Sequence, residues 1–184
     1  MPLPSPSPRE ELHQRRIDLR GYRRDDGLFD IEARLVDTKS HAMTLADGRP
    51  LDAGEAIHDM SIRLVVDVDL QVHEVQACID ASPYRICPEV AATLQRVVGL
   101  RIGPGWSRAV RERFAGPLGC THLTELLQPL ATVAYQTTWP SRRHRPDPVD
   151  AHGRPRKIDS CHAYASSREL VRQRWPDHYT GPGD

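Results

Sequence analysis

Cys120 and His122 place a thiol and an imidazole two residues apart, directly before a stretch with helical periodicity. A thiol at a helix N-terminus is favoured as the thiolate, because unpaired N–H groups and the helix dipole stabilise negative charge there. The thiolate is the form that attacks electrophiles or binds metals. Glu125 adds a carboxylate one turn beyond His122. These three residues are the candidate catalytic groups. The alternative is a buried structural cysteine, with Thr121 as a helix cap and His122 in solvent.

Other histidines, cysteines and acidic residues supply the ligand types that zinc and ferrous iron prefer. Cys161 follows a polar loop, Cys87 precedes Pro88 at another expected helix start, and His58 opens an expected strand. The spacing matches no zinc finger, and His58 has the alternative of a histidine satisfied within the core. The expected cofactor is therefore zinc or iron. The candidate metal ligands are His58, Asp59, Cys87, Cys120, His122 and Cys161.

Several common classes of site are excluded by the sequence. The turn Ile102–Trp106 lacks the Gly-Lys-Ser/Thr ending of a phosphate-binding P-loop. Neither the Gly-x-Ser-x-Gly elbow of hydrolases nor the His-Glu-x-x-His motif of metalloproteases occurs. The 25 basic and 25 acidic residues balance, so neither a nucleic acid nor an anionic membrane is an expected partner.

The secondary structure that must position these groups is expected to change from strands to helices halfway along the chain. Apolar residues recur at every second position in residues 17–21, 29–35, 60–68 and 75–79, which predicts four strands. The last two are joined by a short connection at 69–71, so they are expected to pair as a hairpin. By parity, His58 falls on the same strand face as Met60.

Helical periodicity follows in the second half. It predicts helices over 88–99, 105–114 and 120–138, and a short one over 166–174. Pro129 lies within the third and is expected to bend it. Strands followed by helices indicate an α+β fold, in which an antiparallel sheet of about four strands from the N-terminal half is covered by helices from the C-terminal half.

The sequence predicts one domain over residues 11–180. The Pro/Ser-rich residues 1–10 are expected to be disordered, 141–158 to form a polar loop, and 181–184 to fray. No export signal and no apolar run of membrane-spanning length is seen, so a cytoplasmic location is expected. Four cysteines far apart in such a chain predict free or metal-bound thiols rather than disulfides.

Five separated motifs resemble the bacterial domain-of-unknown-function family 2889. They are Arg20–Glu32, Ile57–Met60, Gly119–Leu123, Tyr135–Gln136 and Asp159–Ala163, and the resemblance extends over about residues 13–180. The family implies no activity, but its motifs contain the same histidines and cysteines that the chemistry selects.

A second resemblance is to the U-type iron–sulfur cluster scaffold proteins, which also run from a strand hairpin to helices. In that comparison Asp59, Cys87 and Cys120 hold the places of cluster ligands. The first scaffold cysteine has no counterpart, because His58 stands beside Asp59 instead. The chain therefore departs from cluster assembly, while a site for a single metal ion remains compatible with it.

Three functions are compatible with these observations. The leading hypothesis is a small metal-assisted or thiol-dependent enzyme acting on a small organic substrate in bacterial metabolism. The second is an accessory protein, either a metal or iron–sulfur carrier or a subunit of a larger catabolic enzyme. The third is a ligand-binding module. A closed pocket with Cys120 or His122 on its wall favours an enzyme, whereas the same groups exposed beside an apolar patch favour an accessory protein.

Overall fold

A four-stranded antiparallel sheet forms the N-terminal half of the protein in a computed structural model that describes residues 3–182. The strands follow the order β1-β2-β5-β6. A separate pair, β3 and β4, forms a small hairpin between β2 and β5. The bounds are β1 His13–Arg23, β2 Phe29–Lys39, β3 Met43–Thr44, β4 Pro50–Leu51, β5 Ala56–Val66 and β6 Val72–Ala81.

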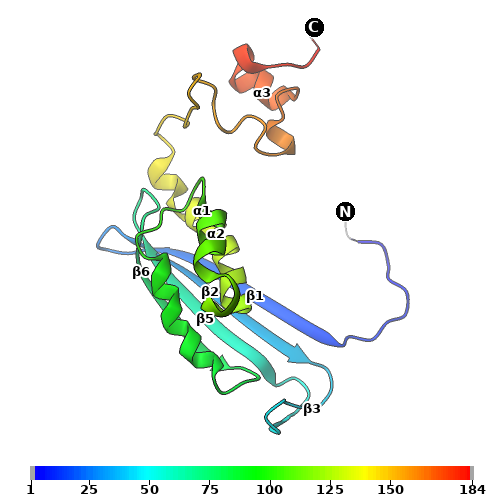
Figure 1. Cartoon of the computed structure of the whole chain (residues 1–184). Helices are drawn as coiled ribbons and strands as arrows, with labels where there is room; N and C mark the ends of the chain where they lie inside the picture. The colour runs from blue at the N-terminus through cyan, green and yellow to red at the C-terminus, as the bar shows by residue number, and fades with distance from the viewer. Residues whose placement is uncertain (1–2, 183–184) are drawn as a thin grey trace. The chain divides into compact units, whose positions relative to one another are not determined.

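Helices from the second half lie over one face of this sheet (Figure 1), which confirms the α+β prediction. The element expected over 88–99 has 3-10 geometry, and the helix expected over 120–138 runs four residues further. The bounds are η1 Cys87–Val97, α1 Trp106–Phe114, η2 Gly116–Leu118 and α2 Thr121–Arg142.

The core fills the space between this sheet face and α2. Alternate residues of β2 and β5, including Ile31, Leu35, Met60 and Leu64, are buried because successive side chains of a strand point to opposite faces. On α2 the buried residues recur at helical spacing. They are Leu123, Leu126, Leu127, Leu130, Ala134 and Thr138.

Two features position α2 against its neighbours, α1 and the sheet. Pro129 has no N–H to donate within the helix, and close by the indole N–H of Trp106 donates to the carbonyl of Leu127 at 3.1 Å. Farther along, Thr137 lies directly over Gly21 of β1, where a Cβ would overlap the threonine side chain. Helix and strand therefore approach closely at this glycine.

The chain divides into two compact units, one ending at Arg142 and one beginning at Arg143, whereas the sequence predicts one domain over residues 11–180. The second unit holds η3 (His162–Tyr164), α3 (Glu169–Arg174) and η4 (Pro176–His178). The short helix expected over 166–174 begins three residues later than predicted. In the described residues, no helix is long and apolar enough to cross a membrane.

Candidate functional site

The apolar rows on the covered face of the sheet end in a polar cluster. Leu35 of β2 is paired with Met60 of β5, and two residues further the facing pair is Asp37 and His58. On the other side of Asp37, the register places Arg15 of β1 opposite it. Since the side-chain period is two, all three point to the same face as the core. The first turns of α2, with His122 and Glu125, lie over this end of the sheet.

Asp37 is the centre of the cluster. It is only 1% exposed, so its charge must be compensated by direct partners. Arg15 donates to both of its oxygens, at 2.8 Å and 2.7 Å. The Nδ1 of His58 lies 2.9 Å from Oδ2, and the Nε2 of His13 lies 3.5 Å from Oδ1. Arg15 also reaches Glu125 at 2.7 Å, which links β1 and β2 to α2.

The pKa of Asp37 is lowered by this arrangement. Burial, the largest single effect, acts in the opposite direction and would raise it. The hydrogen bonds and charge of Arg15, together with those of His58, outweigh burial. Asp37 is therefore ionised at neutral pH, and an ionised carboxylate accepts a hydrogen bond from the Nδ1–H of His58.

His58 and His122 meet from opposite sides, one from β5 and the other from α2. Their ring centroids are 3.9 Å apart and the planes are tilted by 34°. One ligand atom from each of Asp37, His58 and His122 can be chosen so that all three lie within 4.8 Å of one another. Among the described residues, Asp37, His58 and His122 form the group of Cys, His, Asp or Glu side chains in which at least three members lie close enough to hold one metal ion.

The pKa of His122 is lowered. Burial is the main cause, and the electrostatic interactions with His58 and Arg15 act in the same direction. Asp37 and Glu125 oppose the shift without cancelling it. His122 is therefore a neutral imidazole at neutral pH, with a lone pair available to a proton or a metal ion.

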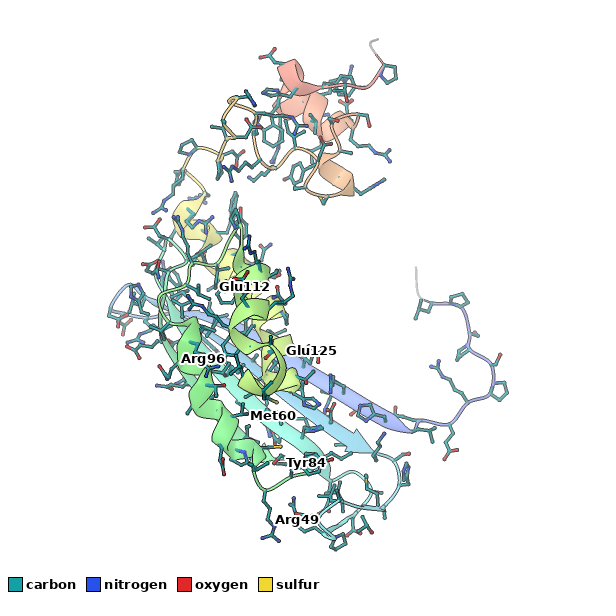
Figure 2. The ribbon with its side chains drawn as sticks, in the orientation of Figure 1. Arg49, Met60, Tyr84, Arg96, Glu112 and Glu125 are labelled. Atoms are coloured by element: carbon teal, nitrogen blue, oxygen red, sulfur yellow. The ribbon has the colours of Figure 1, made fainter. Side chains whose placement is uncertain are left out.

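A pocket of about 550 Å³ opens beside the two imidazoles. His58, His122, Cys120 and Cys87 all lie on its wall, and the Sγ of Cys120 lies 3.9 Å from the Nδ1 of His122. The pocket is bounded by β5, the chain leading into η1 and the start of α2. Figure 2 labels Met60 and Tyr84, two further residues of its wall. Pockets of this size are typical of sites for small molecules.

The structure brings together four of the six metal ligands predicted from the sequence, around this pocket: His58, Cys87, Cys120 and His122. Glu125, predicted as a catalytic helper, is exposed and paired with Arg15. Asp59 lies on the opposite face of the sheet, where Arg34 donates to both of its oxygens at 2.8 Å and 2.6 Å. Cys161 belongs to the second unit. All four cysteines are in the described residues, and none of them forms a disulfide.

Sequence reasoning missed Asp37 and Arg15. Asp37 continues the inward-facing series of Phe29, Ile31, Ala33 and Leu35, and this parity was the available signal. An acidic residue directly after an apolar alternation is typical of the position where a strand ends. Its burial becomes understandable only when Arg15, from a different strand, is seen to face it.

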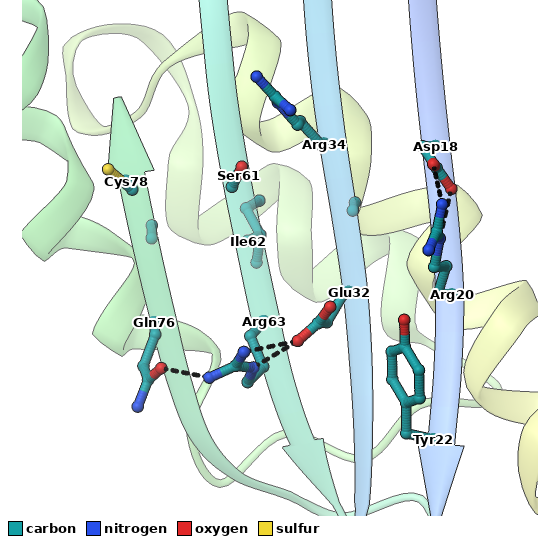
Figure 3. Close-up of a pocket in the computed structure, with 12 residues that line it drawn as sticks. Asp18, Arg20, Tyr22, Glu32, Arg34, Ser61, Ile62, Arg63, Gln76 and Cys78 are labelled. Atoms are coloured by element: carbon teal, nitrogen blue, oxygen red, sulfur yellow. Dashed lines mark hydrogen bonds and ion pairs between the residues drawn. The ribbon is translucent and has the colours of Figure 1, made fainter. Parts of the chain in front are cut away.

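A second hollow, of about 680 Å³, lies on the uncovered face of the sheet (Figure 3). Its charged groups are paired with their neighbours. Arg20 binds Asp18 at 2.8 Å, and Arg63 binds Glu32 at 2.6 Å and Gln76 at 3.1 Å. These side chains already have partners within the sheet, and no group of potential metal ligands gathers there in the described residues. The candidate site is therefore the pocket on the covered face.

Comparison with known proteins gives a single type of match. A family model described as "Protein of unknown function (DUF2889)" matches residues 13–136. This range contains β1 to β6 and the part of α2 that carries the site. No curated protein and no solved structure matches. The resemblance to iron–sulfur cluster scaffold proteins therefore finds no support in these comparisons.

Proposed function

The chain belongs to the DUF2889 family, and we propose that it is a metal-assisted enzyme acting on a small organic substrate. Asp37, His58 and His122 would hold one zinc or ferrous ion at the wall of the pocket. The observation that carries the proposal is the convergence of these three side chains, from two strands and one helix, to within 4.8 Å.

The ligand types and their spacing support a metal ion. Two imidazoles and one carboxylate form the donor set typical of non-haem ferrous iron, and the same groups bind zinc. The 2.9 Å between Asp37 Oδ2 and His58 Nδ1 is close to the spacing of adjacent ligands. Bonds of about 2.1 Å set two ligands about 3.0 Å apart at the right angles of a ferrous site and about 3.4 Å apart in a tetrahedral zinc site. An ion would replace the proton that the two residues share.

The charges around the cluster also favour a cation. Asp37 and Glu125 carry two negative charges, whereas Arg15, which contacts both of them, carries one positive charge. A bound ion supplies a Lewis acid that polarises a substrate oxygen or lowers the pKa of a bound water. Cys120, next to His122 on the pocket wall, is placed to donate a proton to the reacting molecule or to attack it.

An accessory role is the second candidate, favoured by apolar side chains near the same segments. Tyr84 and Ile86, on the pocket wall, are 53% and 66% exposed, and Leu118 is 45% exposed. In this alternative the metal-loaded protein docks on a larger enzyme through these residues. We place either activity in the cytoplasm of a bacterium, because four unpaired thiols fit a reducing compartment.

Metal analysis of protein prepared without a histidine tag tests the proposal. Zinc or ferrous iron, added separately to protein stripped with a chelator, should bind in an equimolar amount. His122→Ala should weaken this binding by at least about tenfold. Losses of this size follow when even the residues that hold the ligands of a metal are mutated. His152→Ala, an exposed histidine of the second unit, is the matched control and should bind normally.

Proton release provides a second measurement that needs no variant. Metal added to the wild-type protein in weak buffer should release protons, since the hydrogen shared by Asp37 and His58 must leave. Circular dichroism checks that His122→Ala is folded. The absence of equimolar binding in the wild type, or full binding by folded His122→Ala, would contradict the proposal.

A further inference from the structure

The pocket beside His58 and His122 has an apolar wall built mainly from one short segment. Its apolar side chains are Met60, Pro83, Tyr84, Ile86, Val90 and Pro117. Four of these six come from residues 83–90, where the chain passes from β6 into η1. A molecule bound against this segment exchanges water for hydrocarbon and aromatic surface, which favours an apolar ligand body.

Apart from the two imidazoles and residues 119–121 at the start of α2, the wall offers no partner for a negative charge. Among the described residues that line the pocket there is no lysine and no arginine, while Glu89 contributes a carboxylate. The hydroxyl of Thr93 already donates to the carbonyl of Val90 at 2.7 Å. A ligand that carries an anionic group away from the imidazoles would therefore lose its hydration without gaining an ion pair.

Arginines near the pocket are directed elsewhere. Arg15 is held by Asp37 and Glu125 at 2.7 Å each. Arg85, next to Ile86 in the chain, is paired with Asp47 at 3.4 Å. The cations that could have received an anionic substrate thus have carboxylate partners already.

Two of the apolar wall residues are also unusually exposed. Tyr84 is 53% exposed and Ile86 is 66% exposed, although both side chains are large and apolar. A ligand seated in the pocket would cover part of this surface, and removing this apolar area from water would stabilise the complex.

We propose that the substrate is a neutral, mainly apolar molecule, such as an aromatic or short-chain aliphatic alcohol or carbonyl compound. Its body lies against residues 83–90, and its one oxygen points to the ion between His58 and His122. The assignment rests on the proposed function, because the ion is what receives that oxygen. It excludes phosphorylated and dicarboxylic compounds, whose second charge would lie against the apolar wall.

Binding of two alcohols that differ only at the far end tests this substrate class. The probes are benzyl alcohol and para-(hydroxymethyl)benzoate, titrated into the zinc-loaded full chain and followed by backbone amide NMR shifts. Both carry the same hydroxyl. A carboxylate is itself a zinc ligand, so tight binding of the benzoate through it would also count against a neutral substrate. Benzyl alcohol should shift amides of residues 83–90 and 119–122 and bind about tenfold tighter or more. Equal or tighter binding of the benzoate, or no binding of benzyl alcohol, would overturn the inference.

A charge placed on the wall sharpens the test. Ile86→Lys should reverse the preference towards the benzoate, because it adds a cation where the carboxylate would lie. The side chain is mostly exposed, so the fold should survive. Val149→Lys makes the same change at a side chain that is 50% exposed in the second unit, and it should leave the preference unchanged. An unaltered preference in Ile86→Lys would count against the proposed orientation.

The same samples separate this inference from the proposed function. Metal binding without discrimination between the two alcohols would overturn the substrate class and leave the metal site intact. Discrimination by a wild-type protein that binds no metal would reject the metal-assisted enzyme and retain the preference for neutral apolar ligands. His122→Ala should keep the preference while binding benzyl alcohol more weakly, since the apolar wall is unchanged.

Discussion

Arg15 of β1 binds both carboxylate oxygens of Asp37 of β2, at 2.8 Å and 2.7 Å. The aspartate is buried, while the arginine side chain is 31% exposed. The same guanidinium reaches Glu125 of α2. One side chain therefore joins the edge strand, its neighbour and the helix, and it keeps a buried carboxylate ionised next to the two imidazoles.

Arg15→Met should lower the free energy of unfolding by roughly 1–3 kcal/mol, because it leaves Asp37 buried without its main partner. The exposure of the arginine keeps the expected loss at the lower end of what buried ion pairs cost. Arg20→Met is the matched control on the same strand. Arg20 and Asp18 are both mostly exposed, so its loss should be within about 1 kcal/mol. Urea unfolding measures both, and equal losses would show that the Arg15 pair is unimportant.

Asp59→Asn should leave metal binding unchanged, although its neighbour His58 is a proposed ligand. Its carboxylate lies on the uncovered face and is bound by Arg34. Asp37→Asn should lose at least about tenfold in affinity, on the scale seen when ligands and their partners are removed. Zinc titration of the two folded variants gives the comparison. Greater loss in Asp59→Asn than in Asp37→Asn would reverse the assignment.

Gly21→Ala should destabilise the protein by about 1–3 kcal/mol, the usual effect of forcing extra atoms into a filled space. The added Cβ would overlap the side chain of Thr137. Thr137→Ala removes the two atoms at the end of that side chain, so the double variant should recover part of the loss. Thermal unfolding of the four proteins gives the coupling. Additive losses would mean that helix and strand do not meet at this point.

Asp67→Asn should lower stability by about 1 kcal/mol at neutral pH. Asp67 accepts hydrogen bonds from the backbone N–H groups of Asp69 and Gln71 and from His73, in the turn between β5 and β6. Burial acts to raise its pKa, but these partners prevail and the pKa is lowered below 3.8. The stabilisation is thus fully present above the unfolded-state pKa and is lost as pH falls through the folded-state pKa.

The measurement for this turn is the difference in unfolding free energy between wild type and Asp67→Asn, followed from about pH 6 to about pH 3. The difference should shrink at the acid end. Asp25→Asn, at an exposed position in the turn after β1, should show no comparable change. A constant difference across the range would indicate that the carboxylate charge plays no part in holding the turn.

The strands were predictable because one face of the sheet is buried and the other is exposed. This difference produces the alternation that identified β2 and β5, and also the hairpin of β5 with β6. The helical spacing of Leu123, Leu126, Leu127 and Leu130 similarly revealed α2. The 3-10 geometry of η1 was not predictable, since apolar spacing alone does not distinguish it from an α-helix.

Three residues of the candidate site could be identified from local sequence. Cys120 and His122 stand at a helix start, and His58 lies at the inward parity of its strand. Asp37 and Arg15 could not be identified in this way, because each is explained only by the other. Their pairing depends on the register between β1 and β2, and register is a property of two segments rather than of either one.

The donors of the site are widely separated along the chain, on β2, β5 and α2. An ion shared by them would act as a cross-link that closes the long loop between His58 and His122, in the same way as a disulfide closes a loop. The chain must bring its two halves together before the cross-link can form. Metal loading should therefore slow the separation of α2 from the sheet. Only a folded chain, in which the donors have come together, would bind the ion.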